Sequence, residues 1–322
     1  MSHLTYLEAS FIGLLQGVTE LFPVSSLGHS VLIPAILGGQ WARDLDVSTK
    51  ESPYLAFIVG LHVATALALV LYFWRDWVRI IGGFLTSLRD RRVVTADQRL
   101  AWMIILATIP VGAAGLLLEH PFRVLLGKPI PASIFLTANG LILFAGERLR
   151  RKASRRADAQ VAAEVDAVER HGRHAAGHRA LRRQEAALDL ASDRRIADLG
   201  YAQSVIIGAA QILALMAGVS RSGVTMVAGL FRGLSHEDAA RFAFLLATPV
   251  ILAAGALKIP DLTGPLGQGI HGQILVGSVL SFIGAYLSVR FLTKYFQTRT
   301  LTPFAIYCLL AGIFSFIFLT TT

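Results

Sequence analysis

The chain has 322 residues, of which 54% are apolar and only 16% charged, and its mean hydropathy is +0.58. A soluble domain carries roughly 25% charged residues, so this composition excludes an ordinary soluble protein. The net charge of +9 does not indicate nucleic-acid binding, because the most basic stretch of the chain lacks the aromatic residues on which bases would stack. Cys308 is the only cysteine, which excludes disulfides within the chain and a cysteine-based metal site.

Apolar blocks follow one another along the chain, and most are long enough to cross about 30 Å of hydrocarbon as a helix. They run at 9–38, 54–73, 100–118, 130–146, 200–230, 242–257, 273–289 and 301–320. The two longest, 9–38 and 200–230, are each broken near the middle by polar and helix-breaking residues. Such a block is typical of a helix–loop–helix that enters the membrane and returns by the same face, so the other six blocks are predicted to cross.

The sequence therefore predicts an all-α polytopic membrane protein with an inverted repeat, each half being a re-entrant helical hairpin followed by three transmembrane helices. The halves are 1–146 and 200–322, joined by a charged cytoplasmic loop at 147–199. The loops 74–99, 147–199, 231–241 and 290–300 then share one side and hold most of the Arg and Lys, as expected of the cytoplasmic side. Both termini are expected outside.

The long loop 147–199 contains 13 Arg and Lys against 9 Asp and Glu. We interpret it as a solvated segment that follows the positive-inside rule. His171, His174 and His178 have helical spacing there, but no acidic residue stands at a suitable offset. Solvated histidines are a better interpretation than a metal site.

Ionisable residues deep in apolar segments are costly and usually functional. Apart from block edges, two strong charges of opposite sign lie in such places: Glu20 in the first broken block and Arg221 in the second. A buried ion pair that only ties the halves together is the simpler alternative. His62, in the block 54–73, is interpreted as a packing residue.

The first break contains Gln16, Glu20, Ser25, Ser26 and His29 around a proline. Gln16 and Glu20 are four residues apart and share one helix face. Either serine is suited to cap the helix that follows the proline. His29 lies three residues after Ser26 and is expected to face the same way. A helix start of this kind favours a bound anion.

The second break contains Ser220, Arg221, Ser222 and Thr225, and predicts another helix start. Arginine matches phosphate oxygens with two parallel hydrogen bonds. Two helix N-termini, a guanidinium, hydroxyls, a carboxylate and an imidazole together favour a phosphate or diphosphate group.

The segments Gln16–His29 (QGVTELFPVSSLGH) and Ala217–Thr225 (AGVSRSGVT) resemble the two signature motifs of the undecaprenyl-diphosphate phosphatase family, also called bacitracin-resistance proteins. The resemblance continues through Arg241–Gly255 and covers most of the chain outside the long loop. Ala217 stands where the family usually has proline. Gln16 stands where the family has Glu or Gln, which leaves a single carboxylate near the site.

The resemblance implies hydrolysis of a C55 polyprenyl diphosphate to the monophosphate and inorganic phosphate, which recycles the lipid carrier of cell-wall synthesis and confers bacitracin resistance. It implies a multi-pass protein of the bacterial plasma membrane whose site opens to the outer face. Membrane lipids are expected partners, nucleic acid is not, and a homodimer is an open alternative.

The resemblance also implies roles for the residues of both motifs. Arg221, with Ser25, Ser220, Ser222 and Thr225, would hold the phosphoryl oxygens. Glu20, assisted by Gln16, would hold a divalent cation, Mg²⁺ or Ca²⁺. Ser26 or His29 would be the nucleophile, and we favour attack by Ser26 with His29 as the base.

Two other functions share part of this pattern. Phosphatidate-phosphatase-type enzymes require a His and an Asp at fixed distance after a Ser-Arg pair, and this chain has Met226 and Val227 five and six residues after Arg221. A transporter or flippase of a polyprenyl phosphate or another anion would share the inverted halves and the anion site. Ser26 with His29 favours hydrolysis over transport, since transport needs neither.

Overall fold

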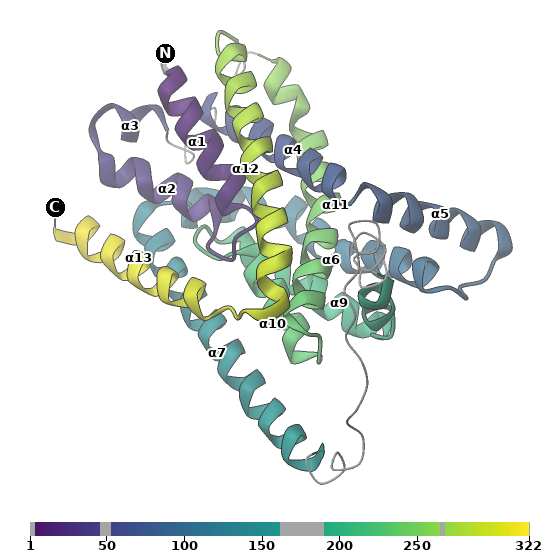
Figure 1. The fold of residues 1–322 in the computed structure, drawn as a ribbon. Helices are drawn as coiled ribbons and strands as arrows, with labels where there is room; N and C mark the ends of the chain where they lie inside the picture. Colours follow the sequence, from purple (N-terminus) through teal and green to yellow (C-terminus); the bar gives the residue numbers. More distant parts are fainter. Residues whose placement is uncertain (1–3, 46–52, 162–189, 265–267, 322) are drawn as a thin grey trace, which may run out of the picture.

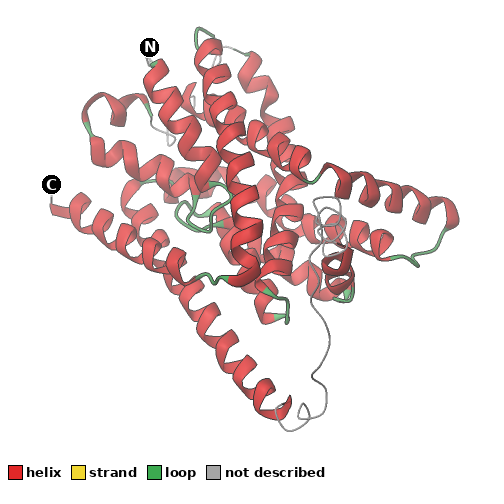
Figure 2. Ribbon diagram, in the orientation of Figure 1, coloured by secondary structure: helices red, strands yellow, loops and turns green. Residues whose placement is uncertain are grey.

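The computed structural model describes residues 4–45, 53–161, 190–264 and 268–321, and every regular element in these ranges is a helix (Figures 1 and 2). The all-α prediction is confirmed. The elements before the long loop are α1 (Tyr6–Thr19), α2 (Ser26–Leu37), α3 (Gly39–Asp44), α4 (Pro53–Tyr72), α5 (Trp74–Asp90), α6 (Ala96–Leu126) and α7 (Pro129–Val161). Those after it are a helix at Leu190–Ala197, α9 (Tyr201–Ala209), η1 (Ala210–Leu215), α10 (Arg221–Phe231), α11 (His236–Thr263), α12 (His271–Thr298) and α13 (Thr302–Thr321).

Within the described residues, five helices are long and apolar enough to cross a membrane, and they coincide with five of the six predicted crossings. They are Ala96–Phe122, Pro129–Arg151, His236–Leu257, His271–Thr298 and Thr302–Thr321. The sixth crossing corresponds to α4, whose 20 residues rise about 30 Å. Since α4 packs against both α11 and α12, it lies within the same bundle. The protein is a polytopic helical membrane protein.

The segment 74–99 was expected to be a connecting loop, and that expectation is wrong over most of its length. Helix α5 occupies it and bends by 83° from α4. Its apolar residues recur along one exposed face, at Trp74, Val78, Ile81, Leu85 and Leu88. This spacing of three to four residues is helical. The arginines lower the mean hydropathy of the whole segment, so hydropathy alone does not reveal the helix.

Both long apolar blocks are broken helices, as predicted. In the first, α1 ends at Thr19 and α2 begins at Ser26. In the second, η1 ends at Leu215 and α10 begins at Arg221. The interruptions therefore fall on the two motifs and place Ser25 and Ser220 directly before a helix.

Small residues let α1 and α12 approach closely. A Cβ added at Gly13 or Gly17 of α1 would overlap the backbone of Gly277 or Ser281 of α12. In the same way, a Cβ at Gly208 of α9 would overlap the backbone of Ala107 of α6. Close backbone contact through glycine is the usual way in which membrane helices associate.

The expected boundary of the long loop at 147 falls inside α7, which continues as a helix to Val161. The other end of this loop is packed into the protein, since Ile196 is buried and Asp193 pairs with both Arg79 and Arg241 at 2.6 and 2.8 Å. The solvated interpretation is thus wrong for this end. His171, His174 and His178 lie outside the described residues.

Candidate active site

Each broken block supplies one capped helix N-terminus. Ser25 caps α2, where its hydroxyl accepts a hydrogen bond from the N–H of Gly28 at 3.2 Å. Ser220 caps α10 and accepts from the N–H of Gly223, also at 3.2 Å. The predicted serine cap of α2 is confirmed, and so is the predicted helix start at the second break. Two positive helix ends therefore begin within the interior of the bundle.

The two breaks lie against each other. A Cβ at Gly28 would come within 2.8 Å of the Gly218 Cα, and Gly218 has a φ of +110°, which a residue with a side chain rarely adopts. The hydroxyl of Ser222 donates to the carbonyl of Phe22 at 3.3 Å. Glycine and serine are thus needed here because the two loops meet backbone to backbone.

Asn139 of α7 joins the two breaks, and the sequence interpretation missed it. Its side-chain oxygen accepts from the N–H of Ser220 at 3.0 Å, and its amide nitrogen donates to the carbonyl of Pro23 at 3.1 Å. Asn139 is fully buried. A lone asparagine in an apolar span was a usable signal, because a buried amide needs partners.

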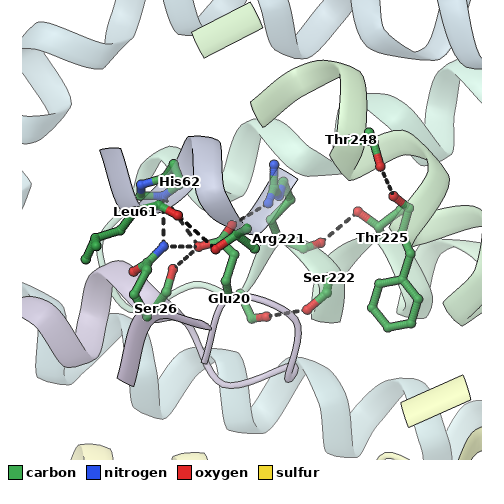
Figure 3. A network of polar contacts seen from close by, with 12 residues as sticks. Glu20, Ser26, Leu61, His62, Arg221, Ser222, Thr225 and Thr248 are labelled. Atoms are coloured by element: carbon green, nitrogen blue, oxygen red, sulfur yellow. Dashed lines mark hydrogen bonds and ion pairs between the residues drawn. The ribbon is translucent and has the colours of Figure 1, made fainter. Parts of the chain in front are cut away.

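Glu20 and Arg221 form an ion pair at this junction (Figure 3). Arg221 Nη2 donates to Oε1 of Glu20, and the two side chains expose only 15% and 6% of their surface. The pair links one half of the chain to the other. It leaves the second carboxylate oxygen, Oε2, for other partners.

Ser26 and Gln16 both donate to Oε2 of Glu20. The Ser26 hydroxyl donates to Oε2, and the Gln16 amide nitrogen lies 2.8 Å from the same oxygen. Gln16 is one helical turn before Glu20 on α1, whereas Ser26 is the first residue of α2. The break therefore folds the hydroxyl of Ser26 back onto the carboxylate.

His62 of α4 also belongs to this cluster, so its interpretation as a packing residue is wrong. Its Nε2 lies 3.4 Å from Oε2 of Glu20 and 3.2 Å from the amide nitrogen of Gln16 (Figure 3). Nothing near His62 in the sequence indicated this. Its place depends on how α4 packs against α1.

His29 lies on α2 but makes different contacts from those expected. Its Nδ1 is 2.7 Å from the carbonyl oxygen of Ser25, and its Nε2 is 2.7 Å from the hydroxyl of Tyr307 on α13. The rings of His29 and Tyr307 also stack at 5.7 Å. Both ring nitrogens thus have partners other than Ser26, and Tyr307 is a second neighbour that sequence reasoning missed.

The remaining hydroxyls of the second motif surround the start of α10. Ser220 and Ser222 lie 3.1 Å apart at their oxygens, and Thr225 donates to the carbonyl of Arg221 at 2.7 Å. All three residues are buried. The first turn of α10 thus presents a guanidinium beside a group of hydroxyls, an arrangement suited to a phosphoryl group.

Within the described residues, no group of three or more His, Cys, Asp and Glu side chains is placed to hold a metal ion. Glu20 is the carboxylate of this cluster. The side-chain oxygen of Gln16 is buried and makes no hydrogen bond within the described ranges. A buried amide oxygen without a partner, on a residue whose amide nitrogen contacts the carboxylate, suits a hard cation that takes its other ligands from a substrate.

Comparison with known proteins agrees with the motifs. The chain is 63% identical over 311 residues to a protein of Mycolicibacterium paratuberculosis named undecaprenyl-diphosphatase, covering 97% of this chain and 96% of the other. It is 56% identical over 333 residues to undecaprenyl-diphosphatase 2 of Frankia alni, covering 97% of each. It is 39% identical over 316 residues to undecaprenyl-diphosphatase 2 of Chromobacterium violaceum, covering 97% and 98%. The model of the bacitracin resistance protein BacA family matches residues 9–314, and the chain belongs to this family.

Proposed function

We propose that this protein is a membrane phosphatase that hydrolyses undecaprenyl diphosphate to undecaprenyl phosphate and inorganic phosphate. One observation carries the proposal: Glu20 holds the hydroxyl of Ser26 on one carboxylate oxygen and the guanidinium of Arg221 on the other. A nucleophile, its proton acceptor and a phosphate-binding cation thus meet at two helix N-termini. Such a product would return to cell-wall synthesis, in accord with a role in bacitracin resistance.

In this mechanism, Ser26 attacks and Glu20 takes its proton. Oγ of Ser26 forms a bond to the terminal phosphorus, the bond to the bridging oxygen breaks, and the lipid monophosphate leaves with the electron pair. Water then attacks the phosphorus of the phosphoserine, and the bond to Oγ breaks. Glu20 returns its proton to Oγ of Ser26, and both protons of the water leave with the inorganic phosphate. Arg221 and the N–H groups of α2 and α10 stabilise the charge on the phosphoryl oxygens. Glu20 replaces His29 as the preferred base, because it contacts Ser26 directly.

A divalent cation, Mg²⁺ or Ca²⁺, completes the proposal. Glu20 and the side-chain oxygen of Gln16 would hold it together with oxygens of the diphosphate. Such an ion supplies positive charge that offsets the charge of the substrate phosphates. Ser25, Ser220, Ser222 and Thr225 would line the phosphoryl group. The homodimer stays a prediction.

An inverted repeat accounts for the packing of the helices. Exchanging α1 with α9 and α6 with α12 converts one close contact, α1 with α12, into the other, α9 with α6. Both contacts depend on glycine in the helix that precedes a break. The same exchange pairs α2 with α10, the two helices that begin at the site. Together with the charge of the loops, this supports an inner-membrane protein whose site opens to the outer face.

The same two-fold packing favours a second function, transport or flipping of a polyprenyl phosphate across the membrane. Phosphate release distinguishes the two. We expect the purified protein in detergent to release inorganic phosphate from undecaprenyl diphosphate, and Ser26→Ala to abolish the release. Ser30→Ala is the matched control, since Ser30 lies one turn further on α2 and its hydroxyl makes no hydrogen bond in the described part of the chain. Transport without phosphate release by the wild-type protein contradicts the phosphatase.

A further inference from the structure

A second group of charged side chains lies away from the candidate active site, around a cavity between the ends of α7, α11 and α12. The cavity has a volume of about 500 Å³, within the range of about 300–1,000 Å³ that is typical of small-molecule sites. Its charged lining residues are three arginines and two glutamates: Arg150, Arg151, Arg299, Glu147 and Glu237. Glu147 follows Asn139 on α7 by eight residues, which places it about 12 Å further along the helix from the junction of the two breaks. None of these residues belongs to either motif, so the proposed hydrolysis leaves them without a role.

The cavity is formed by the ends of three membrane-crossing helices. The crossing Pro129–Arg151 ends at the cavity, the crossing His236–Leu257 begins there, and the crossing His271–Thr298 ends there. These ends therefore meet at one face of the membrane, at the level where lipid headgroups lie. The loops attached to them are among those predicted to be cytoplasmic from their charge.

Glu147 is already paired within the cavity. Its Oε1 accepts a hydrogen bond from Nε of Arg151 at 3.1 Å, and its Oε2 lies 2.8 Å from Nε2 of His236. Both carboxylate oxygens thus have partners, and the charge of Arg151 is offset by an ion pair. A ligand would have to be bound by the other two arginines.

Arg150 and Arg299 form no ion pair with a carboxylate among the described residues. Arg150 donates from Nη1 to Nδ1 of His236, since a guanidinium has no acceptor. The side chain of Arg299 is exposed and makes no hydrogen bond or ion pair within the described ranges. Glu237, the second acidic lining residue, interacts with Arg195. Three arginines against two glutamates leave one positive charge in the lining, which favours an anionic ligand.

The start of α11 adds backbone donors to this cavity. The hydroxyl of Ser235 accepts a hydrogen bond from the N–H of Asp238 at 3.0 Å and caps the helix. The first N–H groups of a helix have no acceptor within it, and its positive dipole end lies with them. The end of α12 brings a negative dipole end to the same cavity. The two dipoles offset each other, so the arginines determine the sign of the ligand.

We propose that this cavity binds a phosphate group at the cytoplasmic face of the membrane, through Arg150, Arg299 and the first N–H groups of α11. Planar guanidinium groups match the oxygens of phosphate. The level of the cavity favours the headgroup of an anionic membrane lipid, because basic pockets between membrane helices on the cytoplasmic side bind such headgroups. Inorganic phosphate in the cytoplasm offers the same chemistry. The site is separate from the breaks and does not depend on whether the protein is a phosphatase.

Binding to the purified full-length protein in detergent tests the proposal, with phosphatidylglycerol as the lipid probe and inorganic phosphate as the soluble probe. Titrations followed by native mass spectrometry measure the lipid, and isothermal titration calorimetry measures phosphate. We expect phosphatidylglycerol to bind more tightly than the zwitterionic phosphatidylcholine. Replacing both Arg150 and Arg299 by Gln should weaken its binding about 25-fold, or about fivefold for each arginine. Arg148→Gln is the matched control, because Arg148 is exposed on the same turn of α7 and does not line the cavity.

Arg299→Gln alone should weaken binding about fivefold without affecting folding, because its side chain is exposed and has no partner among the described residues. Thermal unfolding in detergent identifies any variant that fails to fold. If the substitutions weaken binding of inorganic phosphate but not of phosphatidylglycerol, the site stands and its ligand is soluble. If Arg299→Gln and Arg148→Gln bind both probes equally well, the proposal is wrong. Failure of the wild-type protein to release phosphate would contradict the proposed function and leave these binding measurements unaffected.

Discussion

The hydroxyl of Ser25 accepts a hydrogen bond from the backbone N–H of Gly218 at 3.2 Å. The same oxygen caps α2, so one side chain orders the helix start of its own half and holds the break of the other half. In this position Ser25 has a strained backbone, with a φ of +71° that few residues other than glycine adopt. The junction therefore depends on a hydroxyl in a strained backbone conformation.

Replacing Ser25 by Ala should destabilise the protein. The loss of an N-cap costs about 1 kcal/mol, and the buried N–H of Gly218 left without a partner costs about 1–3 kcal/mol more. Ser25→Gly is the control, because glycine relieves the backbone strain while also lacking the hydroxyl. Unfolding in a denaturing detergent series measures both. Equal stability of wild type and Ser25→Ala would show that the shared hydroxyl does not stabilise the junction of the two breaks.

Arg221→Lys should lower kcat by about 10²-fold or more while the protein still folds. Lysine keeps the charge but loses the planar fork that binds two phosphoryl oxygens, and removing one preorganised donor typically costs about 10²–10³-fold. Arg232→Lys is a matched control at the exposed end of α10. If Arg221→Lys turned over at nearly the wild-type rate, Arg221 would not bind phosphoryl oxygens with two hydrogen bonds. Its role would then be a structural ion pair with Glu20.

The identity of the nucleophile can be read from a trapped adduct. Single-turnover reactions quenched in acid should contain a phosphoryl group that survives acid but not base, because phosphoserine is acid-stable. Ser26→Ala should lack it, and His29→Ala should keep it. An acid-labile, base-stable adduct would instead identify His29, whose ring nitrogens are held by Ser25 and Tyr307 in the resting structure. Absence of any adduct would favour direct attack by water with Glu20 as base.

Removal of divalent cations should stop phosphate release, and Mg²⁺ or Ca²⁺ should restore it. Gln16→Leu should raise the cation concentration needed for half-maximal rate, since it removes one oxygen ligand and leaves Glu20 in place. Manganese binding followed by electron paramagnetic resonance in the presence of the diphosphate checks the same site without turnover. Identical cation dependence in wild type and Gln16→Leu would exclude Gln16 as a ligand.

Topology provides a test that is independent of catalysis. A reporter fused within 147–199 should report the cytoplasm, whereas one fused within 259–271 or after Thr322 should report the outside. This follows if each half contributes three crossings and its broken helix pair adds none. A cytoplasmic reporter after Thr322 would contradict the re-entrant assignment.

The sequence predicts those features that depend on local chemistry. Hydropathy predicts the crossings, and the serines after the proline of the first break predict the cap of α2, because a cap is made by residues three apart. The partners of His62, Asn139 and Tyr307 could not be predicted this way, although a lone asparagine in an apolar span does indicate that partners exist. Each of the three residues lies in an otherwise apolar stretch of its helix, and its role depends on which distant helix packs against it. Asp193 was misjudged for the same reason, since its partners are 48 and 114 residues away.

The resting ion pair between Glu20 and Arg221 also bears on which molecules the enzyme tolerates. The guanidinium of Arg221 is already paired with the carboxylate of Glu20. An arriving anion must therefore displace Glu20, which is part of the same chain and always present at the site. Free inorganic phosphate has no hydrocarbon tail that could add to its binding when it displaces Glu20. A diphosphate carried on a long hydrocarbon tail is held at the membrane and arrives at a high local concentration. We therefore expect inorganic phosphate to inhibit the protein only weakly, because Glu20 occupies Arg221 between turnovers.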